Sequence, residues 1–133
     1  MKNIIEQKKI YEGELKVMEV LWREGYMPAR DLAIRLEALV GWKQTTSYTV
    51  IGRCVKKGFI RRSGIKFMCK VLITREEVQK QEISLLINKV FDGCAKSFLA
   101  SLLGAGNLTP AQLNSIWYTA KEFSNDACDV IAI

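Results

Sequence analysis

The 133-residue chain contains no histidine, and its four cysteines (Cys54, Cys69, Cys94 and Cys128) are scattered without a CxxC or CxC pair. Because histidine and paired cysteines supply most zinc and copper ligands, the sequence predicts no metal site. It also lacks a glycine-rich phosphate loop and a G-x-S-x-G elbow, and a cysteine nucleophile would have no histidine as its base. These absences argue against an enzyme and against a bound cofactor.

Acidic residues are missing from one long stretch of the chain. Residues 38–75 contain no aspartate or glutamate, whereas residues 42–70 alone hold eight lysines and arginines. The formal net charge is +6, but residues 1–73 hold 15 basic and 7 acidic side chains, and residues 74–133 hold 5 and 7. A polyanion would therefore meet a favourable potential in the N-terminal part only. We expect that polyanion to be nucleic acid, although charge alone leaves an anionic membrane surface open.

Long apolar runs are absent as well, since no segment reaches the length of a membrane-spanning helix and no signal peptide is visible. We therefore expect a cytoplasmic protein with reduced thiols and without membrane insertion. Apolar residues make up 49% of the chain, which is enough to form a packed core in one domain or two small ones.

Apolar residues recur at three- and four-residue spacing in two N-terminal segments, which predicts two amphipathic helices. The predicted inner faces consist of Leu15, Met18, Leu21 and Trp22 in residues 12–23, and of Leu32, Leu36, Leu39 and Val40 in the segment after Pro28. After these helices the polarity of the sequence changes, and the basic stretch begins.

The basic stretch predicts a third helix followed by a β-hairpin. We expect the helix to begin at Thr45 or Thr46, either of which would cap it, and to end at Gly58. A turn over residues 61–64 would then lead into a second strand within residues 66–73. Three helices followed by a basic hairpin are the layout of a winged helix-turn-helix, which places its third helix in the major groove of DNA.

The candidate DNA-binding residues lie on this third helix and the hairpin. Threonine, tyrosine and arginine offer contacts to base edges, and the flanking cations offer contacts to phosphates. Lys56 and Lys57 would equally suit the C-terminal end of a helix that never meets DNA. The predicted set is Lys43, Thr45, Thr46, Tyr48, Thr49, Arg53, Lys56, Arg62 and Lys66.

From Thr74 onward the sequence predicts helices alone. Capping boxes over residues 74–77 and 109–112 start two of them, and glycine-containing breaks at residues 92–93 and 104–107 interrupt the helical pattern. These helices have wide apolar faces but too few residues to bury them, so we expect a second copy of the chain to cover them. The side chains expected at this dimer interface are Leu86, Val90, Phe91, Phe98, Leu102, Leu113 and Trp117.

The predicted fold class is therefore α+β, mostly α. We expect a winged helix-turn-helix DNA-binding domain over residues 1–73 and a helical dimerisation domain over residues 74–133. A homodimer would present two recognition helices to the two half-sites of a palindrome.

Two spaced motifs occupy the first sixty residues. Glu14, Val17, Met18 and Trp22 fit the pattern ExxVMxxxW. The pattern W…T…T…R…KKGFI follows, made by Trp42, Thr46, Thr49, Arg53 and residues 56–60. Both motifs resemble those of the penicillinase repressors of the BlaI/MecI family.

The resemblance implies a homodimeric transcriptional repressor that binds a palindromic operator on double-stranded DNA and controls β-lactam resistance genes. The positions that read bases in the family match Thr45, Thr46, Tyr48 and Thr49, with Tyr48 standing where an arginine or histidine is usual. Family repressors are released when a membrane sensor protease system leads to cleavage in the dimerisation region. The matching bond here joins Ser101 to Leu102.

Two alternatives stay open at this point. The same scaffold could carry a repressor that answers a different signal, or a winged helix that binds proteins and no DNA. The acid-free stretch of residues 38–75 argues against the second alternative.

Overall fold

The computed structural model describes residues 8–131 of the chain, and the side chains of residues 8–124. The chain divides into two compact units between Glu82 and Ile83. The first unit contains α2 (Glu12–Glu24), β1 (Met27–Pro28), α3 (Ala29–Val40), α4 (Gln44–Lys56), β2 (Ile60–Ser63) and β3 (Met68–Val71). Helix α5 (Arg75–Val90) begins in the first unit and ends in the second, which contains α6 (Ala95–Gly104) and α7 (Pro110–Ile131). The predicted domain boundary at Thr74 stays a prediction.

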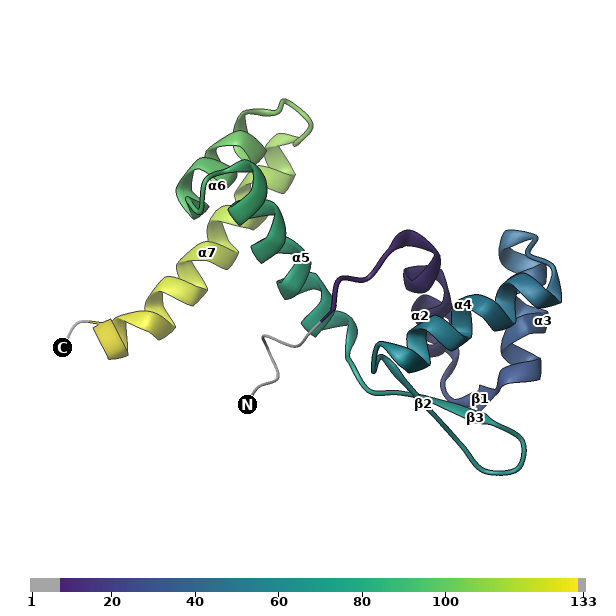
Figure 1. The fold of residues 1–133 in the computed structure, drawn as a ribbon. Helices are drawn as coiled ribbons and strands as arrows, with labels where there is room; N and C mark the ends of the chain where they lie inside the picture. Colours follow the sequence, from purple (N-terminus) through teal and green to yellow (C-terminus); the bar gives the residue numbers. More distant parts are fainter. Residues whose placement is uncertain (1–7, 132–133) are drawn as a thin grey trace. The chain divides into compact units, whose positions relative to one another are not determined.

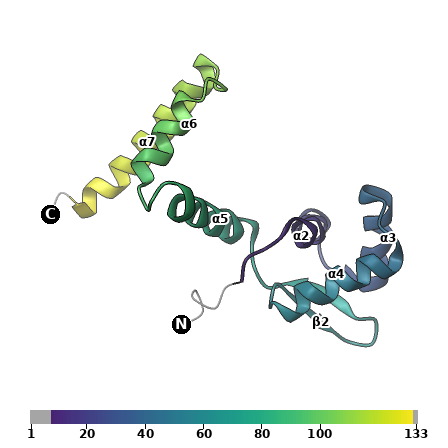
Figure 2. The ribbon, with the colours of Figure 1, turned by 45° about the horizontal axis from the view of Figure 1, so that its top comes forward.

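The first unit is a winged helix, as predicted, with its three helices grouped beside a hairpin (Figures 1 and 2). Its antiparallel sheet has the order β1-β3-β2. Strand β1 was not predicted. The turn predicted at residues 61–64 was wrong, because Ser63 still pairs with Met68 and the chain reverses over residues 64–67.

The core of the first unit joins one face of each helix to the hairpin. Its fully buried members include Val17, Met18, Leu32, Leu36, Ile51, Cys54, Ile60 and Cys69. The prediction of an inward-facing Leu39 was wrong, because this side chain lies beside Glu19 and Arg23 of α2 and is 56% exposed. Ala33 occupies the inner face of α3 in its place.

Helix α4 begins earlier than predicted. Its N-cap is Lys43, whose carbonyl oxygen accepts a hydrogen bond from the Ser47 N–H at 3.0 Å. The prediction that Thr45 or Thr46 caps the helix was therefore wrong, since both lie in its first turn with exposed side chains. The buried face of the helix consists of Ser47, Val50, Ile51 and Cys54.

The start signals predicted for α5 and α7 are confirmed. The Glu77 N–H donates to Thr74 Oγ1 at 3.0 Å, and the Thr74 N–H donates to Glu77 Oε1 at 2.8 Å. Thr109 and Gln112 form the equivalent pair at 2.8 and 3.1 Å. The breaks are confirmed as well, because α5 and α6 are separated by residues 91–94 and α6 and α7 by residues 105–109.

The described apolar side chains of the second unit are all at least partly exposed. No described side chain of residues 83–124 is buried, and Val90 and Trp117 are 61% and 60% exposed. The rings of Phe91 and Phe98 meet edge to face with centroids 5.5 Å apart, although both remain partly exposed. Within residues 8–131, no helix combines the length and the apolar character needed to cross a membrane.

Candidate nucleic-acid interface

Helix α4 has two distinct faces. Ser47, Val50, Ile51 and Cys54 are buried against the core. The predicted recognition residues on this helix all lie on its exposed side: Thr45, Thr46, Tyr48, Thr49, Arg53 and Lys56. Lys43 precedes them as the exposed N-cap residue. One continuous surface thus carries hydroxyl groups at its N-terminal end and cations at its C-terminal end.

Local hydrogen bonds hold two of these side chains. The Thr49 hydroxyl donates to the Thr45 carbonyl oxygen at 3.0 Å. The Gln44 amide nitrogen lies 3.4 Å from the Tyr48 hydroxyl, which is its hydrogen-bond acceptor. Tyr48 is 39% exposed and lies in the second turn of the helix, so part of its side chain is open to solvent.

The hairpin follows α4 without a linker. Gly58 (φ 86°) reverses the chain, and the Phe59 N–H then donates to the Cys54 carbonyl oxygen at 2.9 Å. A side chain at Gly58 would strain this left-handed backbone conformation. This backbone hydrogen bond connects the start of the hairpin to the last turn of α4. We call α4 and the hairpin together the reader.

The hairpin concentrates positive charge. Arg61 on β2 lies directly opposite Lys70 on β3, and like charges in such a cross-strand pair destabilise a sheet. Arg62 and Lys66 are exposed nearby, and the sequence supplies no carboxylate between residues 38 and 75 to neutralise them. A bound polyanion would relieve this repulsion.

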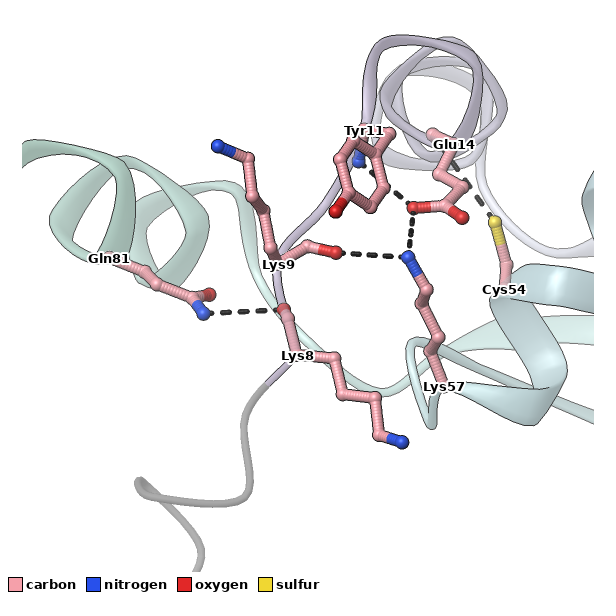
Figure 3. Close-up of polar contacts among 7 residues, drawn as sticks. All are labelled: Lys8, Lys9, Tyr11, Glu14, Cys54, Lys57 and Gln81. Atoms are coloured by element: carbon pink, nitrogen blue, oxygen red, sulfur yellow. Dashed lines mark hydrogen bonds and ion pairs between the residues drawn. The ribbon is translucent and has the colours of Figure 1, made fainter. Parts of the chain in front are cut away.

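Lys57 differs from its neighbour Lys56 because it points inward (Figure 3). Its Nζ lies 2.8 Å from Glu14 Oε1 and 3.0 Å from the Lys9 carbonyl oxygen. The same nitrogen lies 4.5 Å from the centroid of the Tyr11 ring. These contacts give Lys57 a structural role at the end of α4, whereas Lys56 remains exposed.

Glu14 is part of the first sequence motif, but its contact with Lys57 was not predicted from the sequence. Its side chain is buried, with Glu14 3% exposed, and its Oε1 also accepts a hydrogen bond from the Tyr11 N–H at 2.9 Å. The sequence did contain an indication that Glu14 is buried. Glu14 lies four residues before Met18 and seven before Leu21, which places it on the apolar face of α2. A carboxylate at such a position requires a buried cation.

The cysteines lie in contrasting environments. Burial, aided by the nearby Glu14 carboxylate, raises the pKa of the Cys54 thiol to about 12. Cys94 is exposed, and hydrogen bonding from Ser97 lowers the pKa of its thiol. Within the described residues, no group of three or more histidine, cysteine, aspartate or glutamate side chains could hold a metal ion. The side chain of Cys128 lies outside that part of the chain.

We expect iodoacetamide at neutral pH to alkylate Cys94 well before Cys54. The thiolate is the reactive form, and a lowered pKa increases its fraction at Cys94 while a raised pKa removes it at Cys54. Peptide mass spectrometry after timed labelling would measure both rates. Cys54 should react only after unfolding in urea, and labelling of Cys54 in the native protein at the rate of Cys94 would contradict the buried position.

Comparisons with known proteins find a matching family and several related sequences. Residues 10–121 match the family described as Penicillinase repressor. The penicillinase repressor of Bacillus licheniformis is 22% identical over 119 residues, which cover 88% of this chain and 93% of that protein. The methicillin resistance regulatory protein MecI of Staphylococcus aureus strain N315 is 24% identical over 110 residues, covering 81% and 89%.

Two solved structures are also similar to this chain. The solution structure of the DNA-binding domain of the repressor BlaI has a TM-score of 0.49 at 23% identity, covering 53% of this chain and 89% of that one. The monomeric form of BlaI from Bacillus licheniformis, in complex with the blaP half-operator, has a TM-score of 0.47 at 25% identity with the same coverage. Because the family match extends from the residues just before α2 into α7, this chain belongs to the penicillinase repressor family.

Proposed function

We propose that this chain is a transcriptional repressor that binds a palindromic operator on double-stranded DNA as a homodimer. The observation that supports this function best is the exposed surface of α4 and the hairpin, where cations and hydroxyl groups meet without any acidic residue from 38 to 75. Surfaces of this composition bind the phosphate backbone and read base edges. Relatives named as a penicillinase repressor and a methicillin resistance regulator support the same function.

Each part of the surface would have its own role. Helix α4 would lie in the major groove, where its threonines and Tyr48 reach base edges and Arg53 binds guanine or a phosphate through two hydrogen bonds. Lys43 and Lys56 would contact phosphates at the two ends of the helix. Arg62 and Lys66 would contact the backbone beside the groove.

Dimerisation is supported by the uncovered apolar side chains of the second unit. Leu86, Leu102 and Leu113 are 42%, 41% and 38% exposed, and helices with such faces are stable when a partner covers them. The predicted interface also includes Val90, Phe91, Phe98 and Trp117. A twofold dimer would bury all seven side chains and bring two readers to one palindrome.

Release from DNA would follow from loss of the dimer. Ser101 and Leu102 lie with exposed side chains on α6, and cleavage between them would separate the reader from α7. A monomer loses the effective-concentration advantage of two linked half-sites, a factor of roughly 10² to 10⁴. We propose that the protein acts in the cytoplasm on β-lactam resistance genes, and that a membrane sensor protease system starts this cleavage.

Operator binding should depend on Arg53 and on salt. On a duplex selected by the chain from a random library, Arg53→Ala should weaken binding by roughly 5- to 150-fold, the equivalent of about 1–3 kcal/mol. Affinity falls as the salt concentration rises, and Lys66→Ala should make this fall less steep. The magnitude of the slope of log affinity against log salt concentration should decrease by about 0.9 for each wing bound. Fluorescence anisotropy at several salt concentrations would measure both effects.

The charge-matched control is Arg23→Ala, which removes an exposed arginine from the last turn of α2. It should leave affinity within about twofold, since it lies outside the proposed surface. Binding that stays equally tight from low to high salt would contradict recognition through phosphate contacts. An Arg53→Ala variant with wild-type affinity would show that Arg53 does not contribute to DNA binding.

A further inference from the structure

The turn of the hairpin, residues 64–67, exposes an isoleucine almost completely. Ile65 is 97% exposed, although isoleucine is neither a usual turn residue nor a favourable one to leave in water. Phe67 in the same turn is 55% exposed. We call residues 64–67 the wing tip. Burial within the first unit cannot explain an isoleucine at this position, because almost all of the Ile65 side chain is exposed.

The wing tip is held in a defined shape. Phe67 has φ 54°, a left-handed conformation that is an outlier for a bulky side chain. Its N–H donates to the Gly64 carbonyl oxygen at 3.3 Å, and its own carbonyl oxygen accepts the Ala29 N–H, at the start of α3, at 3.1 Å. This second bond ties the turn to α3, so Ile65 is presented to solvent by a constrained backbone.

Positive charge surrounds this apolar tip. The Arg62 guanidinium lies 5.0 Å from the centroid of the Phe67 ring, and Lys66 follows Ile65 directly. An apolar group framed by cations fits a partner with anionic walls and apolar inner surfaces. The minor groove of DNA has both, since phosphates line its edges and deoxyribose faces line its sides.

We propose that Ile65 enters the minor groove next to the major groove read by α4, and there prefers A·T base pairs. The proposal rests on the proposed function, and it assigns the wing tip a role in sequence preference. Guanine places its N2 amino group on the floor of the minor groove, whereas A·T pairs have none. An isoleucine on that floor strips water from the amino group without replacing its hydrogen bond, which disfavours G·C pairs.

The test uses the full chain and three duplexes that share the selected core. Their flanks contain A·T, G·C or inosine·cytosine pairs; inosine keeps the major-groove pattern of guanine but lacks the N2 amino group. The wild-type chain should bind the A·T and inosine·cytosine duplexes about equally, and the G·C duplex about tenfold more weakly. Ile65→Ser should weaken binding to the first two by about tenfold and bind all three alike.

The matched control is Ile34→Ser on α3. Ile34 is 52% exposed and lies on α3 near Glu24, Asp31 and Arg35, outside the proposed DNA-binding surface, so this variant should keep the wild-type preference. Ile65→Ser should also leave the salt slope unchanged, because an apolar contact releases no counterions.

Two results would overturn the role of Ile65. One is equal wild-type binding to the G·C and inosine·cytosine duplexes. The other is an Ile65→Ser variant that keeps the wild-type preference, which includes an equal loss of affinity on all three duplexes and would indicate a contact that does not depend on sequence. Failure of the wild-type chain to select any duplex from the random library would instead refute the proposed function.

Discussion

Lys57→Met is expected to lower the free energy of unfolding of the first unit by about 3 kcal/mol or more. The substitution keeps most of the apolar stem but removes the ammonium group that lies 2.8 Å from Glu14 Oε1. The side chain of Glu14 is 4% exposed, so its charge would stay buried without its cation. Urea unfolding followed by circular dichroism, at a fixed protein concentration, would measure the loss.

Lys56→Met is the matched control, because it changes the neighbouring lysine in the same way. Lys56 is exposed, and its replacement should change the free energy of unfolding by less than about 0.5 kcal/mol. Equal effects of the two substitutions would show that the ion pair contributes no more to the free energy of unfolding than an exposed charge does.

A double variant separates the charge from the contact. Glu14→Gln keeps an oxygen that accepts the Tyr11 N–H and removes the buried negative charge. Combined with Lys57→Met, it should recover most of the stability lost by Lys57→Met alone, since a buried pair replaced on both sides is often close to neutral. A double variant as unstable as the sum of the two single variants would contradict this interpretation.

Local signals in the sequence were sufficient to predict most helix ends. The capping boxes at Thr74 and Thr109 and the stop at Gly58 depend on residues within one turn of each other, so they are readable without knowledge of the fold. The same holds for the general position of the recognition surface, because the absence of acids from residues 38–75 is visible in the sequence itself.

Features that depend on distant partners were not predictable in the same way. Strand β1 has two residues, and only its pairing with β3 about forty positions later makes it a strand. Lys56 and Lys57 are adjacent lysines that the sequence does not distinguish. They differ because the position of Lys57 at the end of α4 brings its ammonium group to Glu14. Likewise, Ser47 and Ile51 are buried because α4 packs against distant elements of the first unit, which the sequence of the helix alone does not specify.

The largest effect on function is expected from Trp117→Asp on α7. Trp117 is 60% exposed in a single chain, so the substitution should not disturb a core within that chain. A tryptophan buries about 150–250 Å² at an interface. In a twofold dimer both copies of the substitution lie at the same interface, so their effects on dimer stability combine. We expect the dissociation constant of the dimer to rise by about 10³-fold or more, as measured by analytical ultracentrifugation.

Loss of the dimer should also weaken binding to the operator. The affinity for a palindrome should fall by roughly 10² to 10⁴, whereas the affinity of each chain for a single half-site should hardly change. Asn114→Asp is the charge-matched control, because it adds the same carboxylate at an exposed polar position of α7. This control should remain dimeric and bind the palindrome normally.

The comparison of half-site with palindrome distinguishes dimer loss from general unfolding. A Trp117→Asp variant that binds neither duplex would have lost the fold of its DNA-binding surface. In that case circular dichroism would also show a loss of helical content. A variant that remains dimeric at micromolar concentration would contradict the proposed interface. A monomeric variant that binds the palindrome as tightly as the wild-type chain would show that the second unit serves some purpose other than bringing two readers to one operator.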